Sequence, residues 1–178
     1  MTENNGSVNY RQLCKDVCTL AMSTGDYLRE ERQKASQMVV KTKGMHDYVT
    51  QFDKESEYRI VTRLKELLPQ AGFIAEEGSA TNNGTEPFLW IVDPLDGTTN
   101  FIHGFPYYCV SIALSVRGRV EQAVVYDPTR NDLFLASHGR GAYLNNRRIR
   151  VSRRTQLGDS LLSTGFPFRK GDDFKGYH

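Results

Sequence analysis

The feature that most constrains the fold is an alternation of apolar and polar residues that begins near residue 107 and continues to about residue 152. The apolar runs in this stretch are separated by Arg-Gly, Asp-Pro-Thr-Arg-Asn, Gly-Arg-Gly and Asn-Asn-Arg. A period of two is typical of strands with one buried face, and the separating residues are typical of turns. The pattern therefore predicts an antiparallel meander, in which each strand pairs with the next along the chain.

The first part of the chain carries helical patterns instead. Apolar residues spaced three and four apart predict a helix over residues 8–34, with Gly25 as a weak point. A second helix is predicted from Asp53, which we assign as its N-cap, and Pro69 closes it. Two short strands are expected between the helices. Together with the meander, these elements predict an α+β fold, with helices packed on a mostly antiparallel sheet.

The composition of the chain argues against several classes of protein. The chain has 178 residues, which suits a single domain over residues 1–178, and its net charge of +2 gives no reason to expect nucleic acid or a membrane as the main partner. Neither a signal-peptide pattern at the N-terminus nor an apolar run of the ~20 residues that span a membrane is found. Three cysteines, Cys14, Cys18 and Cys109, argue against a disulfide framework. We therefore expect a cytoplasmic protein.

Several carboxylates follow apolar, strand-like runs. They are Glu76 and Glu77 after GFIA, Asp93 after FLWIV, and Asp96 after a Pro-Leu step. If the two strands are neighbours, these acids meet at one edge of the sheet, where like charges either raise each other's pKa values or hold a cation. Because the ligands are all oxygen atoms, a hard ion such as Mg²⁺ is favoured.

The stretch IVDPLDGTTNF adds groups that suit an anion. Pro94 fixes one backbone angle, so that Leu95 can turn its carbonyl outward as a neutral metal ligand. Gly97 allows close approach to the backbone, and its amide and that of Thr98 begin a predicted short helix, GTTNF, where free amides suit phosphate. Taken singly, these residues also fit an ordinary turn, an N-cap or a solvated strand end. Taken jointly, they indicate metal-assisted phosphate hydrolysis.

The longest motif, WIVDPLDGTTNFIHGFP, resembles the signature of the inositol monophosphatase family, a group of Mg²⁺-dependent, lithium-sensitive phosphatases. FIAEE resembles the acidic motif that precedes it, and KGMHDYVTQFD resembles the segment with the water-activating Asp. VVYDPTRNDLFLASHGRGAYLNNRRIRVS and LLSTGFPF resemble the bacterial branch. The resemblance runs from about Val8 to Arg169 and implies the N-terminal portion of the layered αβαβα inositol-monophosphatase/fructose-bisphosphatase fold.

The resemblance also implies a metal site and a phosphate site. The expected metal ligands are the side chains of Glu76, Asp93 and Asp96 and the carbonyl of Leu95, holding two or three Mg²⁺ ions. The expected substrate and phosphate contacts are Glu76, Leu95, Asp96, Gly97 and Thr98. One metal would activate a water, and a second would stabilise the leaving alkoxide.

Three residues are expected to assist the chemistry by the same resemblance. Asp53 and Thr98 would orient and deprotonate the attacking water, and Glu77 would be an auxiliary acid. Two interpretations of Lys43 fit the sequence equally well: a basic group near the entrance of the site, and a solvated lysine in a turn.

The chain departs from the family pattern in one respect. Relatives continue into a second α/β segment with a Trp-Asp-x-Ala-Ala-Gly motif, whose Asp is a further metal ligand, whereas here the only Trp is Trp90. The chain is therefore expected to be the N-terminal α+β part of the fold, with the C-terminal α/β segment absent. A weaker second metal site, an incomplete alcohol pocket and a bare sheet face would follow.

Two functions are compatible with these patterns. The first is a Mg²⁺-dependent phosphomonoesterase that hydrolyses inositol monophosphate or a related small phosphate ester, and the family implies a homodimer that does not bind membranes. The alternative is a non-catalytic or moonlighting binding protein in bacterial RNA processing or transcription, with nucleic acid or a transcription protein as partner. The basic stretch NNRRIRVSRR would serve that alternative, and it also fits a solvated strand edge and loop.

Overall fold

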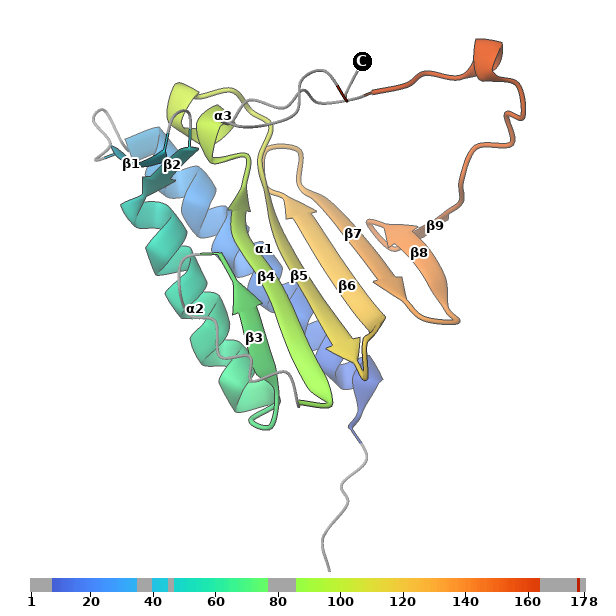
Figure 1. The fold of residues 1–178 in the computed structure, drawn as a ribbon, viewed down its shortest axis with the longest axis horizontal. Helices are drawn as coiled ribbons and strands as arrows, with labels where there is room; N and C mark the ends of the chain where they lie inside the picture. Colours follow the sequence, from blue (N-terminus) through green and yellow to red (C-terminus); the bar gives the residue numbers. More distant parts are fainter. Residues whose placement is uncertain (1–7, 35–39, 45–46, 77–85, 164–175, 177–178) are drawn as a thin grey trace, which may run out of the picture.

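Two long helices pack on one face of a seven-stranded sheet (Figure 1). The computed structural model describes residues 8–34, 40–44, 47–76, 86–163 and 176, the side chains of residues 40–49 apart. In chain order the elements are α1 (Tyr10–Lys34), β1 (Val40–Gly44), β2 (Asp47–Thr50), α2 (Gln51–Leu67), β3 (Gly72–Ala75), β4 (Phe88–Asp96), α3 (Thr98–His103), β5 (Cys109–Val116), β6 (Arg119–Asp127), β7 (Asp132–Ser137), β8 (Gly141–Leu144), β9 (Arg147–Ile149) and a 3-10 helix at Leu157–Asp159. No helix in these described ranges combines the length and apolarity needed to cross a membrane.

The sheet follows the chain order from β3 to β9. β3 and β4 are parallel, and every later neighbour pair is antiparallel. Strands β1 and β2 form a separate antiparallel hairpin. The predicted α+β class and the meander are confirmed. In the central strands β4, β5 and β6, alternation along the strand gives one buried face.

Alternation along the central strands separates a buried face from an exposed face. On the side covered by α1 and α2, Trp90, Ile112 and Tyr126 are at most 1% exposed. On the opposite side, Ile74 and Ile91 are 44% and 38% exposed. Glu76 and Asp93 each follow one of these isoleucines by two residues, so they lie on the same, partly exposed face of the sheet.

Helix α1 continues through Gly25 without a break, so the predicted weak point is wrong. A Cβ atom at Gly25 would lie 2.5 Å from the Tyr126 ring in β6. The glycine therefore lets the helix backbone approach the sheet closely, and burial of neighbouring residues such as Leu28 offsets its poor helix propensity.

The assignment of Asp53 as the N-cap of α2 is also wrong. The N-cap is Thr50, whose hydroxyl accepts hydrogen bonds from the amides of Phe52 and Asp53. Asp53 is the third residue of the helix, and its carboxylate accepts from the Thr50 amide, which completes a capping box.

The chain leaves the sheet after β9. Residues 150–163 contain only the short 3-10 helix and are exposed.

Candidate active site

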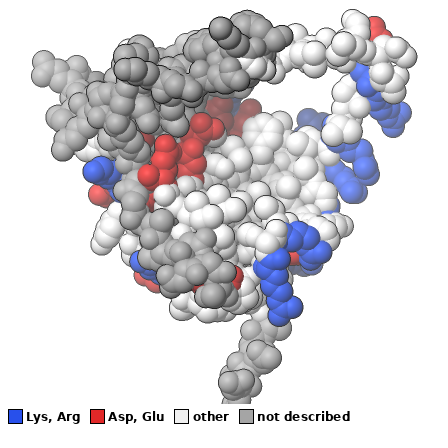
Figure 2. Space-filling model, viewed as in Figure 1, with Lys and Arg blue, Asp and Glu red and all other residues white. Residues whose placement is uncertain are grey.

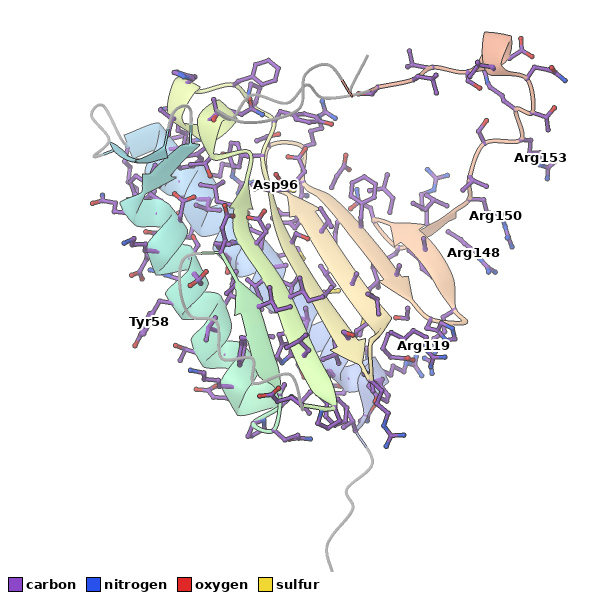
Figure 3. The ribbon with its side chains drawn as sticks, in the orientation of Figure 1. Tyr58, Asp96, Arg119, Arg148, Arg150 and Arg153 are labelled. Atoms are coloured by element: carbon purple, nitrogen blue, oxygen red, sulfur yellow. The ribbon has the colours of Figure 1, made fainter. Side chains whose placement is uncertain are left out.

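The end of β4 carries two carboxylates on one side of the sheet. In a regular strand, residues three apart point to opposite faces. Here Asp93 pairs with Ser111 and Asp96 pairs with Cys109, so three steps along β4 oppose two along β5. The extra residue is a β-bulge, which re-aims the strand end and brings the charge of Asp96 to bear on Asp93. Asp96 lies at the end of β4, beside β5 (Figure 3).

A third carboxylate reaches the same place from β3. The parallel register pairs Ala75 with Val92, so the next residue, Glu76, follows β3 beside Asp93. Glu76 interacts with Asp93 both through its charge and through a side-chain hydrogen bond. Acidic side chains are seen gathered near the end of β4 on the exposed face of the sheet (Figure 2). The predicted meeting of acids at one sheet edge is therefore observed for Glu76, Asp93 and Asp96.

This crowding changes the acidity of Asp93. Burial, then the negative charges of Glu76 and Asp96, raise the pKa of the Asp93 carboxyl to about 7, against a lowering by the Leu95 amide. That amide donates to Asp93 Oδ1 at 3.2 Å. The ionised form of Asp93 is therefore destabilised near neutral pH, and a bound cation would stabilise it.

Asp53 is connected to the end of β4 through Thr98 and is 3% exposed. Its Oδ2 accepts from the Thr50 amide at 2.7 Å and also from the Thr50 hydroxyl. Its Oδ1 accepts from the Thr98 hydroxyl at 2.9 Å. The carboxylate is thus fixed from two elements, and one oxygen is directed towards the start of α3.

Thr98 links Asp53 to the end of β4. Its hydroxyl lies 2.9 Å from Asp53 Oδ1 and 3.1 Å from the Leu95 carbonyl oxygen. A hydroxyl has one hydrogen and two lone pairs, so when it donates to Asp53 it remains able to accept a hydrogen bond. This arrangement is suited to orienting a water molecule.

Gly97 forms the turn between β4 and α3. Its φ is 91°, in the left-handed region, and a Cβ atom there would lie 2.9 Å from the Tyr107 carbonyl oxygen. Any other residue is strained at this position. Glycine thus sets the direction of the short helix that presents the Thr98 hydroxyl.

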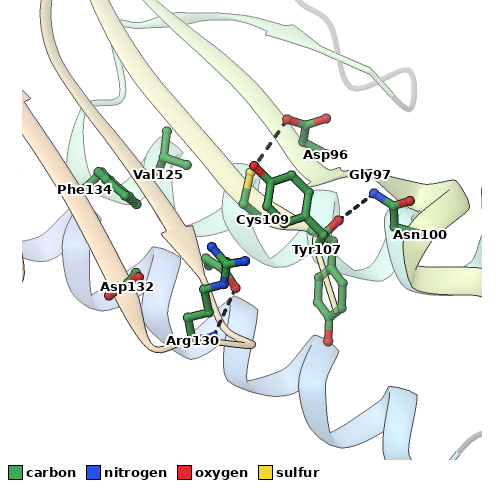
Figure 4. A pocket seen from close by; sticks show the side chains of 11 residues that line it. Asp96, Gly97, Asn100, Tyr107, Cys109, Val125, Arg130, Asp132 and Phe134 are labelled. Carbon is green, nitrogen blue, oxygen red and sulfur yellow. Dashed lines mark hydrogen bonds and ion pairs between the residues drawn. The ribbon is translucent and has the colours of Figure 1, made fainter. Parts of the chain in front are cut away.

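A cavity of about 340 Å³ adjoins Asp96 (Figure 4). Cys109 lines it and donates its thiol to Asp96 Oδ2 at 3.7 Å. Burial, then the charge of Asp96, raise the pKa of Cys109 to about 12, so the thiol stays protonated at neutral pH. Arg130 lines the same cavity, with its guanidinium 5.4 Å from the centre of the Tyr107 ring. The pocket thus combines a cation, an aromatic ring and a carboxylate.

The donor set fits Mg²⁺ in its chemistry, since it offers carboxylate oxygens and the Leu95 carbonyl. Within the described ranges, no three His, Cys, Asp or Glu side chains are already positioned around one ion. Glu76 and Asp96 are exposed, so their carboxylates are accessible to an ion from solvent. Glu77 and the side chain of Lys43 lie outside the described residues, and their expected roles stay predictions.

Two residues that form contacts at this site are harder to identify from the sequence than the acids are. Thr50, which fixes Asp53, could have been found from the pattern Thr-x-x-Asp at the start of the helix. Cys109 has the sequence context of a packing residue, and no local pattern predicts its contact with Asp96, because the register of β4 and β5 creates it.

Comparison with known proteins shows what this chain is similar to. A family model described as "Inositol monophosphatase family" matches residues 9–177. A protein named Nus factor SuhB from Pseudomonas aeruginosa is 47% identical over 151 residues, covering 84% of this chain and 56% of that protein. The crystal structure of extragenic suppressor protein suhB from Bartonella henselae has a TM-score of 0.76 and 39% identity, covering 80% of this chain and 55% of that one. An IMPase/NADP phosphatase complexed with Mg²⁺ and phosphate has a TM-score of 0.67 and 28% identity, covering 78% and 52%.

The fold belongs to the inositol-monophosphatase/fructose-bisphosphatase class, and one similar structure in this class holds Mg²⁺ and phosphate. The chain belongs to the inositol monophosphatase family. It spans about half the length of the curated relatives that it matches.

Proposed function

We propose that this chain carries the phosphate-cleaving half of a Mg²⁺-dependent phosphomonoesterase that acts on inositol monophosphate or a related small phosphate ester. The observation that carries the proposal is the hydrogen bond between Thr98 and buried Asp53, next to the carboxylates at the end of β4. Family membership and the similar structure with Mg²⁺ and phosphate support it.

In this proposal, Glu76, Asp93, Asp96 and the Leu95 carbonyl hold the metal ions. Bound Mg²⁺ supplies positive charge that polarises the phosphoryl group and acidifies water. The protein's own part is to gather these oxygens on one side of the sheet, which the β4 bulge accomplishes. The number of ions, two or three, is an expectation from the family.

The remaining residues would position the reactants. The Thr98 hydroxyl donates to Asp53 and accepts from the attacking water, and Asp53 takes the proton as general base. The amides of Gly97 and Thr98 would contact the phosphate, and Glu77 is proposed as an auxiliary acid. The cavity beside Asp96 offers room for the organic part of the ester, with Arg130 at its wall.

Phosphate release from inositol monophosphate tests this function. We expect release that requires Mg²⁺, is abolished by EDTA and is lost in Asp93→Asn. Asp159→Asn is the matched control, because Asp159 is exposed and lies in the 3-10 helix that follows the last strand of the sheet. Release that is independent of Mg²⁺, or unaffected by Asp93→Asn, would contradict the proposal.

A second candidate is a binding role with RNA or a transcription protein. Five arginines lie within eight residues, and all are exposed: Arg147, Arg148, Arg150, Arg153 and Arg154. Three of them, labelled in Figure 3, project from β9 and the segment that follows it. The relatives named Nus factor support this alternative.

Salt-dependent RNA binding would separate the two candidates. Removal of one arginine–phosphate interaction should reduce the slope of log affinity against log salt by about 0.7 for a single strand. We expect the double variant Arg148→Glu/Arg150→Glu to weaken RNA binding, while Asp93→Asn leaves it unchanged. Equal binding by the double variant would rule out a role for this basic segment.

A further inference from the structure

A second cavity, of about 350 Å³, lies between the first turns of α1 and strands β6, β7 and β8. Gln122 lines it, whereas Asp127, further along β6, lines the cavity beside Asp96. These two residues are roughly 16 Å apart at the rise of a β-strand. The two cavities share no lining residue, so the second is distinct from the candidate active site.

Basic side chains gather around this second cavity. Its basic lining residues are Arg11, Lys15, His138 and Arg140. None of them forms a side-chain ion pair within the described part of the chain. Glu121 is the acidic lining residue, and it pairs with Arg119 at 3.4 Å. The cavity therefore has an excess of positive charge among its described lining residues.

The N-terminus of α1 adds to the positive electrostatic potential of the cavity. A helix carries partial positive charge at its N-terminus, which acidic residues in the first turn commonly balance. The first turn of α1 has no acidic residue, and Arg11 lies within it. Arg140 approaches from the other side, where its charge helps to lower the pKa of Cys14, after larger effects from Cys18 and Ser137. An anion in the cavity would meet favourable charge from both the helix and the sheet.

Gln122 is an unusual residue in the lining of such a cavity, because it is both polar and buried. Its side chain is 4% exposed, and its Nε2 has no hydrogen-bond partner within the described residues. It alternates along β6 with Val124 and Tyr126, which are buried against the helices, so an apolar residue would suit the position as packing alone. A buried amide without an acceptor is unfavourable, and an acceptor atom on a ligand would satisfy it.

We propose that this cavity binds a small organic phosphate. Its phosphoryl group faces Arg11, Lys15 and Arg140, and one of its acceptor atoms receives a hydrogen bond from Gln122 Nε2. Arginine forks match phosphate oxygens in geometry, which favours phosphate as the anion. Because the protein supplies the cations, binding requires no metal ion, unlike binding at the end of β4.

The cavity also indicates the size and character of the ligand. Its volume exceeds that of a bare ion and lies in the range of small-molecule sites. Tyr10 and Tyr143 line it and offer aromatic surface to a ring. A nucleoside monophosphate has this combination of a ring and a phosphoryl group.

Adenosine monophosphate, titrated into the ¹⁵N-labelled chain in EDTA, tests the proposal. We expect amide shifts centred on α1, Gln122 and residues 137–143, with no shifts at Gly97 and Thr98. Arg140→Glu should weaken binding on the order of tenfold or more. Arg150→Glu, an equal charge change outside the cavity (Figure 3), should alter it less than about twofold.

Gln122→Leu separates a ligand contact from a packing defect. We expect this variant to remain folded and to bind adenosine monophosphate several-fold more weakly, since it loses the donor. Shifts centred on Gly97, equal effects of the two arginine variants, or no shifts at millimolar nucleotide would overturn the proposal. Loss of phosphatase activity alone would not affect it, because the measurement contains no divalent ion.

Discussion

The hydroxyl of Thr98 lies 2.9 Å from Asp53 Oδ1 and joins two helix starts that are 45 residues apart in the chain. Thr98 begins α3 directly after the β4 bulge, and Asp53 is locked into α2 by its capping box. The contact therefore couples the acidic sheet edge to a buried carboxylate. Both local stability and the proposed water positioning depend on it.

Thr98→Ala should destabilise the chain by about 1.5–3 kcal/mol, because a buried carboxylate loses a hydrogen bond. Mg²⁺-dependent phosphate release should fall on the order of 100-fold. Thr99→Ala is the matched control: Thr99 is exposed, and its loss should change the free energy of unfolding by less than about 0.5 kcal/mol. Urea unfolding of both variants measures the difference, and equal values would show that the hydrogen bond contributes nothing.

Asp93 should make the stability of the metal-free chain dependent on pH. Its pKa is raised from 3.8 to about 7 in the folded state, so the folded chain binds the proton more tightly than the unfolded chain. The free energy of unfolding should therefore fall as the pH rises from about 4 to about 7, on the order of 1–2 kcal/mol after solvent screening.

Asp93→Asn should remove this part of the pH dependence and make the metal-free chain more stable at pH 7 than the wild type. Mg²⁺ should remove the same decrease in the wild type, because the cation offsets the negative charges. Urea unfolding at several pH values, in EDTA and in Mg²⁺, provides the measurement. A wild-type profile that matches Asp93→Asn in EDTA would be inconsistent with crowded carboxylates.

Gly25→Ala should destabilise the fold despite the better helix propensity of alanine. The new Cβ would lie 2.5 Å from the Tyr126 ring, and a buried ring cannot move without disturbing β6. We expect a loss of about 1–3 kcal/mol. Gly158→Ala, where a Cβ meets nothing within 4 Å, should be close to neutral. Thermal unfolding distinguishes the two, and an increase in Tm for Gly25→Ala would contradict the close approach.

The sequence predicts much of this arrangement because apolar periodicity is a local signal. The meander from β5 to β9 follows from alternation and turn residues, and the acids at the ends of β3 and β4 follow from the residues after each strand. The bulge that turns Asp93 and Asp96 to one side depends on register against β5, which alternation does not specify.

Competing local patterns account for the errors. Asp53 fits an N-cap by residue type because aspartate is common there, but Thr50 precedes it and both fit one capping box. Gly25 fits a helix breaker by residue type, but in the fold it lies against the Tyr126 ring, where a side chain has no room. Tertiary structure decides both cases, and it involves residues that a local sequence pattern does not bring together.

Divalent-ion titration by calorimetry tests the central claim most directly, namely that acids from β3 and β4 together hold a cation. We expect Mn²⁺ or Ca²⁺ to bind the wild type and to bind Asp96→Ala at least about tenfold more weakly, with Asp159→Ala unchanged. Binding of equal strength by the wild type and Asp96→Ala would contradict the proposed metal site.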